Sequence, residues 1–243
     1  MSLARRASAE LAGTALLVAA VVGSGIAAAR LSPHDAGLQL LQNAVATALA
    51  LGALILTFGP VSGAHLNPVV SAVDWWLGRR ASTGGLTGSE LAAYVAAQCA
   101  GGVLGAVLAN AMFDLPAVTW ATTARAGGHL WLAEVTATAG LVLLVVTLAR
   151  TGRTGAAPAA IGAYIGAAYW WTSSTSFANP AVTFGRMFSD TFAGIAPGSV
   201  PAFVAAQAAG GLLALAAATW WYPHAARDSA DVVVPHDQEV TYR

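Results

Sequence analysis

The sequence predicts an all-α membrane protein with six transmembrane helices plus two re-entrant half-helices arranged as an inverted repeat. Of the 243 residues, 57% are hydrophobic and only 9% are charged, whereas about a quarter of the residues in a soluble domain are charged. Six apolar segments are long enough to cross or nearly cross a bilayer. They cover residues 11–29, 38–58, 91–113, 130–149, 156–171 and 200–222.

Two Asn-Pro dipeptides, Asn67-Pro68 and Asn179-Pro180, each begin a shorter apolar segment. Asn is a favoured helix N-cap, and Pro suits the first helical position because its missing N–H has no intrahelical partner there. We therefore expect half-helices over residues 67–78 and 179–190. About ten residues span roughly 15 Å, half of the hydrocarbon thickness, so the two helix starts can meet at the midplane. Broken helices in corresponding halves are typical of a transport site.

An internal repeat relates the two halves of the chain. The Ala-Ala-Gln-x-x-Gly-Gly motif around Gln98 recurs around Gln207 (207 − 98 = 109), and the Asn-Pro pairs are separated similarly (179 − 67 = 112). Each half holds three spans, an odd number, so the second half must insert upside down. We assign residues 1–122 to the first repeat, 123–226 to the second, and 227–243 to a polar cytoplasmic tail.

Two carboxylates, Glu10 and Glu134, occupy equivalent positions of the repeat inside apolar spans. Because an ionisable group within a span is costly, it usually faces the bundle interior and has a partner. One interpretation is a proton relay. The other, which we favour, is structural: each carboxylate accepts N–H bonds from the irregular strand that leads into a half-helix, where backbone donors have no ladder partner.

The distribution of arginine predicts the orientation. An N-terminus on the inside places eight arginines in the cytoplasm and three outside, as the positive-inside rule requires. The chain has no lysine, which with its high alanine content favours a bacterial source. We expect a multi-pass protein of the cell inner (cytoplasmic) membrane with both termini cytoplasmic. The inner arginines are Arg5, Arg6, Arg79, Arg80, Arg150, Arg153, Arg227 and Arg243, and the outer ones are Arg30, Arg125 and Arg186.

The centre of such a bundle would favour neutral solutes. Each half-helix start carries about half a positive charge from the aligned peptide dipoles, which repels cations, including hydronium. If each Asn oxygen caps its own helix, the amide NH₂ groups of Asn67 and Asn179 become donors for a hydroxylated solute. His65, just before the first pair, is either a ligand or proton carrier or, as we favour, a pore-side or packed polar residue. The five histidines show no metal-ligand spacing, and a lone cysteine excludes an internal disulfide.

The run Ser-Gly-x-His-x-Asn-Pro at residues 62–68, the run Asn179-Pro180-Ala181, the Glu10 and Glu134 helices and the repeated glutamine motif resemble the major intrinsic protein family, the aquaporins and aquaglyceroporins. The resemblance implies an aquaporin-like fold, one pore per subunit, and a homotetramer. It also implies a passive channel rather than an enzyme, with no cofactor and no metal. The expected partners are membrane lipid, water and small neutral solutes. With zero net charge and no block of like charge, we expect no nucleic acid partner.

Departures from the family pattern bear on the solute. Val69 replaces the usual Ala near the pore midplane, and Val182 replaces an Arg that usually narrows the outer constriction. The resemblance implies an outer selectivity filter of small side chains, which predicts a wide and neutral opening. Its positions are Thr47, Ala167, Ser176 and Val182.

We therefore expect a channel for glycerol-like polyols, metalloid hydroxides such as arsenous acid, and water, closed to ions and protons. Val182 and the run over residues 190–195 are similar to bacterial members associated with arsenic handling. A strict water channel is the alternative. A coupled secondary transporter is the alternative from another class, but it should carry coupling carboxylates near Asn67 and Asn179, where the sequence has none.

Arg186 follows Val182 by one helical turn, so it shares the same helix face. It either restores positive charge to the outer vestibule or pairs on the surface with Asp190, which follows it by a further turn. The sequence leaves both open.

Overall fold

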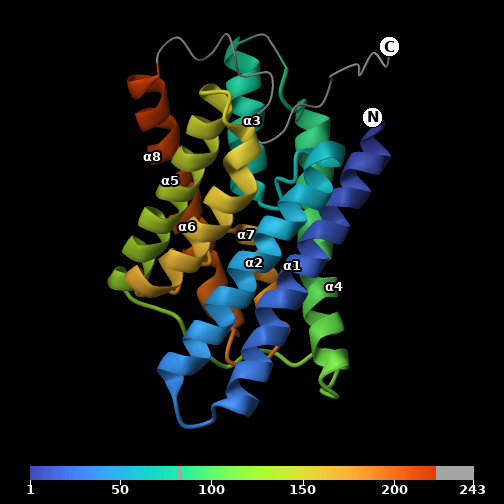
Figure 1. The fold of residues 1–243 in the computed structure, drawn as a ribbon, viewed down its shortest axis with the longest axis vertical. Helices are drawn as coiled ribbons and strands as arrows, with labels where there is room; N and C mark the ends of the chain where they lie inside the picture. The colour runs from blue at the N-terminus through green and yellow to red at the C-terminus, as the bar shows by residue number, and fades with distance from the viewer. Residues whose placement is uncertain (82–83, 223–243) are drawn as a thin grey trace.

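The computed structural model describes residues 1–81 and 84–222, so the predicted tail at 227–243 lies outside the described residues. The described chain is helical, without strands, and forms one bundle (Figure 1). Its α-helices are α1 (Leu3–Leu31), α2 (Ala36–Ser62), α3 (Pro68–Ala81), α4 (Gly88–Met112), α5 (Gly128–Arg150), α6 (Ala157–Trp171), α7 (Pro180–Arg186) and α8 (Val200–Trp221), with short 3-10 turns at Thr154–Ala156 and Pro197–Ser199.

The predicted fold class is confirmed. Five of the described helices (α1, α2, α4, α5 and α8) are long and apolar enough to cross a membrane. The sixth predicted span is α6, whose 15 residues give a length of about 22 Å. The N-terminus and the C-terminal ends of α3, α5 and α8 lie at one end of the bundle, here called the N-terminal end (Figure 1).

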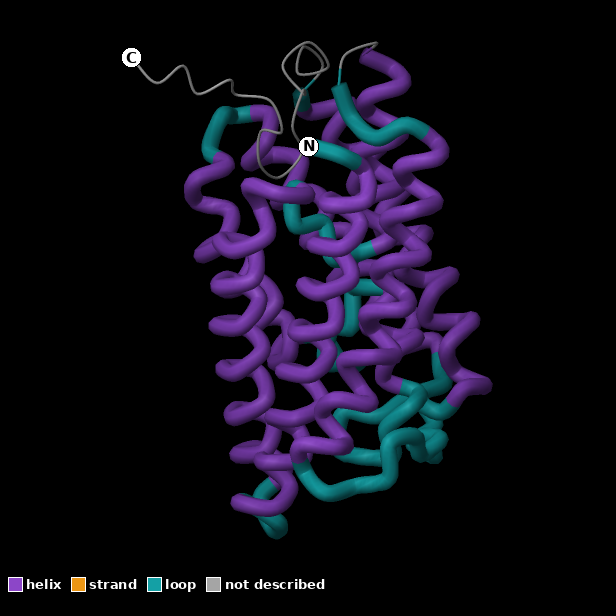
Figure 2. The backbone as a smooth tube through the Cα atoms, turned by 90° about the vertical axis from the view of Figure 1, so that its right-hand side faces the viewer, coloured by secondary structure: helices purple, strands orange, loops and turns teal. Residues whose placement is uncertain are grey.

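The half-helices α3 and α7 begin at the two prolines. The segments that precede them are loops that run inside the bundle (Figure 2). They form no sheet, and we call them the irregular strands. The second half-helix is shorter than predicted, because α7 ends at Arg186 rather than at residue 190. Beyond that point the carbonyls of Met187 and Phe188 accept bonds from the backbone N–H groups of Ala121 and Thr119, so these two residues pair with the loop between α4 and α5 instead of continuing a helix.

Glycines bring the long helices into close contact. A Cβ added at Gly101 would meet the backbone carbonyl of Leu11 on α1, and one at Gly210 would meet that of Val135 on α5. These two glycines occupy equivalent positions of the repeat, so α1 packs on α4 as α5 packs on α8. Gly162 approaches the carbonyl of Ala48 in the same way where α6 crosses α2. Small residues at such crossings are the usual means of helix association in a membrane.

The substitution Gly101→Ala should lower stability by about 1–3 kcal/mol, because the new methyl group overpacks a crossing that backbone atoms fill. Gly128→Ala is the matched control, since nothing lies within 4 Å of a Cβ built there. Thermal unfolding of the purified protein in detergent measures both. Equal midpoints for the two variants would contradict the close packing of α1 on α4.

Candidate functional site

An internal cavity of about 60 Å³ follows the bundle axis past both Asn-Pro motifs. Apolar side chains from α1, α2, α5 and α6 form most of its wall. Its polar groups come from the two irregular strands and from Thr47 on α2, Tyr169 on α6 and Arg186 on α7. Its lining residues are Leu17, Val21, Thr47, Leu51, Ile55, Ala64, His65, Leu66, Asn67, Val70, Leu141, Val145, Ile161, Ile165, Tyr169, Ser176, Phe177, Asn179, Val182 and Arg186.

The two asparagines hold the half-helix starts together. Oδ1 of Asn67 accepts the backbone N–H of Val69 at 3.0 Å, and Oδ1 of Asn179 accepts that of Ala181 at 3.0 Å. Nδ2 of Asn67 donates to the Ala178 carbonyl at 2.8 Å, and Nδ2 of Asn179 donates to the Leu66 carbonyl at 2.7 Å. An amide NH₂ has two donors, so each asparagine keeps one N–H toward the cavity that it lines.

The strands that lead into the half-helices have a strained backbone with several residues in the left-handed region. Ala64 and Leu66 have φ angles of 47° and 48°, and their repeat equivalents Ser176 and Ala178 have 50° and 48°. Such left-handed conformations are costly for residues with a Cβ, at about 1–3 kcal/mol each. They persist only where the surroundings enforce them, so each strand needs a rigid support.

Glu10 supports the first strand. Its Oε1 accepts bonds from Ser62 Oγ at 2.6 Å and from the His65 backbone N–H at 3.0 Å. Its Oε2 accepts bonds from the Leu66 backbone N–H at 2.7 Å and from Gln98 Nε2 at 2.7 Å. The carboxylate is fully buried and lies outside the cavity lining, so its contacts are those of a structural group.

Glu134 supports the second strand in the same way. Its Oε1 accepts bonds from Ser174 Oγ at 2.6 Å and from the Phe177 backbone N–H at 2.9 Å. Its Oε2 accepts bonds from the Ala178 backbone N–H at 2.9 Å and from Gln207 Nε2 at 2.6 Å. The two networks match residue for residue, as an inverted repeat requires.

At the end opposite the N-terminus, the cavity wall carries a positive charge. Arg186 is 2% exposed and lines the cavity. Its Nε donates to the Ala193 carbonyl, and its guanidinium carbon lies 3.4 Å from the centre of the Phe177 ring. Asp190 accepts bonds from Thr122 instead, at 2.9 Å and 3.0 Å. The surface pair of Arg186 with Asp190 is therefore not formed, and the expectation of a neutral outer opening is wrong.

Arg125, in the loop before α5, contributes a second guanidinium behind this wall. Its guanidinium carbon lies 5.1 Å from the centre of the Phe177 ring, and its Nε donates to the Gly194 carbonyl at 2.9 Å. Burial lowers the pKa of this guanidinium, which stays protonated at neutral pH as arginine does in proteins. Arg125 does not line the cavity, so only one of the two charges faces a passing solute.

The structure does not place Ala167 in the outer opening. Ala167 lies on the exposed side of α6, and Ile165 and Tyr169 are the residues of this part of α6 that line the cavity. The Tyr169 hydroxyl lies 3.1 Å from Thr47 Oγ1, within hydrogen-bond distance. The outer opening is thus formed with a tyrosine in place of a small residue. The other three residues that were predicted for the outer filter, Thr47, Ser176 and Val182, do line the cavity.

Four residues predicted at the pore midplane lie behind it. Pro68, Val69, Pro180 and Ala181 do not line the cavity, although the asparagines beside them do. The side chain of Val69 points at Gly211 on α8, where an added Cβ would meet Val69 Cγ1. The change from Ala to Val at this position is therefore accommodated by helix packing and leaves the cavity wall unchanged.

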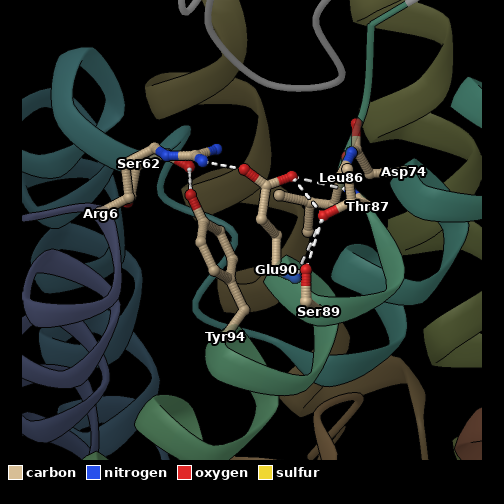
Figure 3. A network of polar contacts seen from close by, with 8 residues as sticks. All are labelled: Arg6, Ser62, Asp74, Leu86, Thr87, Ser89, Glu90 and Tyr94. Carbon is tan, nitrogen blue, oxygen red and sulfur yellow. Dashed lines mark hydrogen bonds and ion pairs between the residues drawn. The ribbon is translucent and has the colours of Figure 1, made fainter. Parts of the chain in front are cut away.

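His65 lines the cavity toward the N-terminal end and is held by its neighbours. Its Nδ1 lies 3.1 Å from Ser71 Oγ, and its ring meets the edge of the Tyr94 ring at a centroid distance of 5.4 Å. Tyr94 in turn donates to the Ser62 carbonyl at 2.9 Å, next to an ion pair between Arg6 and Glu90 (Figure 3). The contacts favour the interpretation of His65 as a pore-side polar residue.

Sequence reasoning missed Gln98, Gln207 and Tyr169. Both glutamines are fully buried and bind the carboxylates described above. The signal was present, because a glutamine retained in both copies of an apolar motif predicts a buried polar partner. No comparable signal marked Tyr169, since tyrosine is common at the ends of membrane spans.

Comparisons with known proteins agree with this architecture. Residues 1–178 match the family described as major intrinsic protein. The chain is 49% identical over 218 residues to the aquaglyceroporin AqpS of Rhizobium meliloti (strain 1021), covering 90% of each chain. It is 31% identical over 220 residues to the glycerol uptake facilitator protein of Pseudomonas aeruginosa, covering 78% of this chain and 75% of that one.

A solved structure shows the same fold. The aquaglyceroporin from Plasmodium falciparum superposes with a TM-score of 0.64 at 17% identity, covering 92% of this chain and 98% of that one. The matched length, the paired Asn-Pro motifs and the two carboxylate networks lead to one conclusion. The chain belongs to the major intrinsic protein family.

Proposed function

We propose that this protein is a passive channel for small uncharged solutes, namely glycerol-like polyols, metalloid hydroxides such as arsenous acid, and water, and that it excludes ions and protons. The observation that carries the proposal is the pair of asparagine amides that meet inside an otherwise largely apolar cavity. Two donors at one level suit a solute with several hydroxyl groups. The helix starts behind them repel cations.

The relatives support the solute class. One is named an aquaglyceroporin and another a glycerol uptake facilitator protein. Arsenous acid is an uncharged trihydroxy species at neutral pH, so it would use the same donors as a polyol. Within the described residues no carboxylate lines the cavity, which favours a passive channel over a coupled transporter.

A strict water channel is the second candidate, and the outer opening favours it. Tyr169 and Arg186 line the cavity where small neutral side chains were expected, and the cavity volume is only about 60 Å³.

Stopped-flow light scattering on proteoliposomes separates the two candidates. We expect wild-type vesicles to re-swell under glycerol, urea and arsenous acid. Vesicles that shrink quickly under sucrose but do not re-swell under any of these three solutes would indicate a strict water channel.

The substitution Val182→Arg should reduce glycerol and arsenous acid permeability by about tenfold or more, equivalent to about 1.4 kcal/mol in the barrier. A second guanidinium would then lie one turn, about 5.4 Å, inside Arg186. Water permeability should fall less. Val182→Thr, which keeps the side-chain volume, is the matched control and should pass glycerol as the wild type does. Unchanged glycerol flux through Val182→Arg would mean that this position does not set the opening.

We further propose that the chain forms a homotetramer in the bacterial inner membrane with both termini cytoplasmic. The described arginines that lie toward the N-terminal end outnumber those toward the opposite end, which supports this orientation. A row of exposed apolar side chains on α2 offers a surface for a neighbouring subunit: Leu38, Leu41, Val45, Leu49 and Leu56.

A further inference from the structure

A second cavity, of about 540 Å³, lies on the outside of the bundle between α4 and α8. Its floor is formed by the backs of the half-helices α3 and α7, and its side walls by α4 and α8. The lining is apolar throughout. We call it the α4–α8 groove, and the residues that carry the argument are Trp75, Trp76, Cys99, Phe184, Ala208 and Leu212.

The groove runs at the depth of the hydrocarbon core. Pro68 and Pro180 form part of its floor, and each directly follows an asparagine that bonds across to the other half-helix. These helix starts therefore mark the middle of the span. An opening at this depth on the outer surface faces lipid or a neighbouring protein, because water is absent from the hydrocarbon region.

One end of the groove is basic. Arg79 and Arg80 are exposed at the end of α3, and their guanidinium carbons lie 5.3 Å and 4.9 Å from the rings of Trp75 and Trp76. Both indoles line the groove. Within the described residues neither arginine has a carboxylate at ion-pair distance, since the one such pair joins Arg6 to Glu90. At the end of the α4–α8 groove there are therefore two cations that no carboxylate of the described residues neutralises.

The distance along α3 matches the geometry of a lipid. Arg79 lies eleven residues beyond Pro68 (79 − 68 = 11), which places it about 16 Å from the midplane. Half of the hydrocarbon thickness is about 15 Å. The guanidinium groups thus reach the level of the phosphate headgroups while the indoles lie just below it, in the position of an interfacial aromatic belt.

We propose that the α4–α8 groove binds an anionic phospholipid, with one acyl chain along the backs of α3 and α7 and the headgroup phosphate on Arg79 and Arg80. Basic clusters beside membrane helices attract anionic headgroups. The acyl chain gains specificity from packing rather than from leaving water, since the surrounding lipid is equally apolar. A second copy of the chain is the competing occupant, but it would have to present a carboxylate to both arginines at headgroup depth.

Photocrosslinking in proteoliposomes tests this site. The host lipid is phosphatidylcholine, and the probe is phosphatidylglycerol with a diazirine at mid-chain, at low mole fraction. We expect adducts concentrated on groove residues of α3 and α8, mapped by mass spectrometry, and suppressed by unlabelled phosphatidylglycerol. The same diazirine chain on phosphatidylcholine should label the groove several-fold less. Adducts spread evenly over the outward faces of α1, α2 and α5 would overturn the proposal.

Two pairs of variants locate the headgroup and the chain. The double variant Arg79→Gln with Arg80→Gln should reduce phosphatidylglycerol adducts in the groove by about tenfold. The double variant Arg5→Gln with Arg153→Gln removes the same charge from exposed positions away from the groove and should leave them unchanged. Ala208→Phe fills the groove and should abolish groove adducts from both lipids, whereas Ala209→Phe, on an exposed neighbouring position outside the lining, should not.

Water permeability of the same proteoliposomes reports that each variant is folded, because none of these residues lines the pore. Equal groove labelling in the two arginine double variants would overturn the headgroup assignment. An unlabelled groove beside labelled outer helices would mean that another protein chain covers it, which also overturns the proposal.

Discussion

Replacing Glu134 by alanine should abolish the folded channel. The change leaves four buried donors without an acceptor: Ser174 Oγ, the backbone N–H groups of Phe177 and Ala178, and Gln207 Nε2. Each buried donor without a partner costs about 1–3 kcal/mol, so the sum is about 4–12 kcal/mol. Typical proteins have only about 5–15 kcal/mol of stability in total.

The readouts are the thermal midpoint in detergent and the water permeability of proteoliposomes. In Glu134→Gln one carbonyl oxygen still accepts hydrogen bonds, but an NH₂ group replaces the second carboxylate oxygen and points at other donors. The thermal midpoint and the water permeability of this variant should therefore lie between those of the wild type and of Glu134→Ala. Glu90→Ala is the surface control, since Glu90 is only partly buried. Its loss should cost about 1–2 kcal/mol through the helix cap and the ion pair with Arg6.

The two interpretations of the carboxylates make different predictions for Glu134→Gln. A structural group predicts a lower thermal midpoint and a proportional loss of all permeabilities. A proton relay predicts a wild-type midpoint with altered proton flux alone. Because all four bonds run to the strand and to its supports, we expect the first result. A wild-type midpoint for Glu134→Ala would show that the strand holds its left-handed backbone without this carboxylate.

The sequence predicts those parts of this architecture that occur in both repeats. The Asn-Pro pairs and the two glutamates recur at matched positions, so the half-helix starts and their supports could be predicted from chemistry and spacing. The direction of single side chains could not be. Val69 and Val70 are adjacent, yet only Val70 lines the cavity, because helix rotation depends on neighbours that a repeat does not specify.

The outer opening shows the same limit. Only the family resemblance predicts Ala167 at the opening, because α6 carries none of the repeated motifs that would fix its rotation, and in the structure Tyr169 faces the cavity instead. The position of Arg186 depends on Phe177 and Ala193, which come from segments before and after α7. Such a contact between separate loops has no local signature in the sequence.

The substitution Arg186→Met should make the pore permeable to small cations. The guanidinium lines the cavity, and a unit charge at about 4 Å opposes a passing cation by about 4 kcal/mol at an effective dielectric constant of about 20. Losing even a third of that barrier raises cation flux about tenfold. Current recordings in planar bilayers measure it, and water flux in proteoliposomes shows that the pore remains intact.

Arg125→Met is the matched control, because it removes an equal charge that also stacks on Phe177 but does not line the cavity. It should leave cation exclusion intact, and so should Arg186→Lys, which keeps the charge without the planar guanidinium. If Arg186→Met conducts no more cations than Arg125→Met, the half-helix dipoles alone exclude ions. Arg186 would then act on neutral solutes only, as a hydrogen-bond donor at the opening, and its loss should appear in glycerol flux instead.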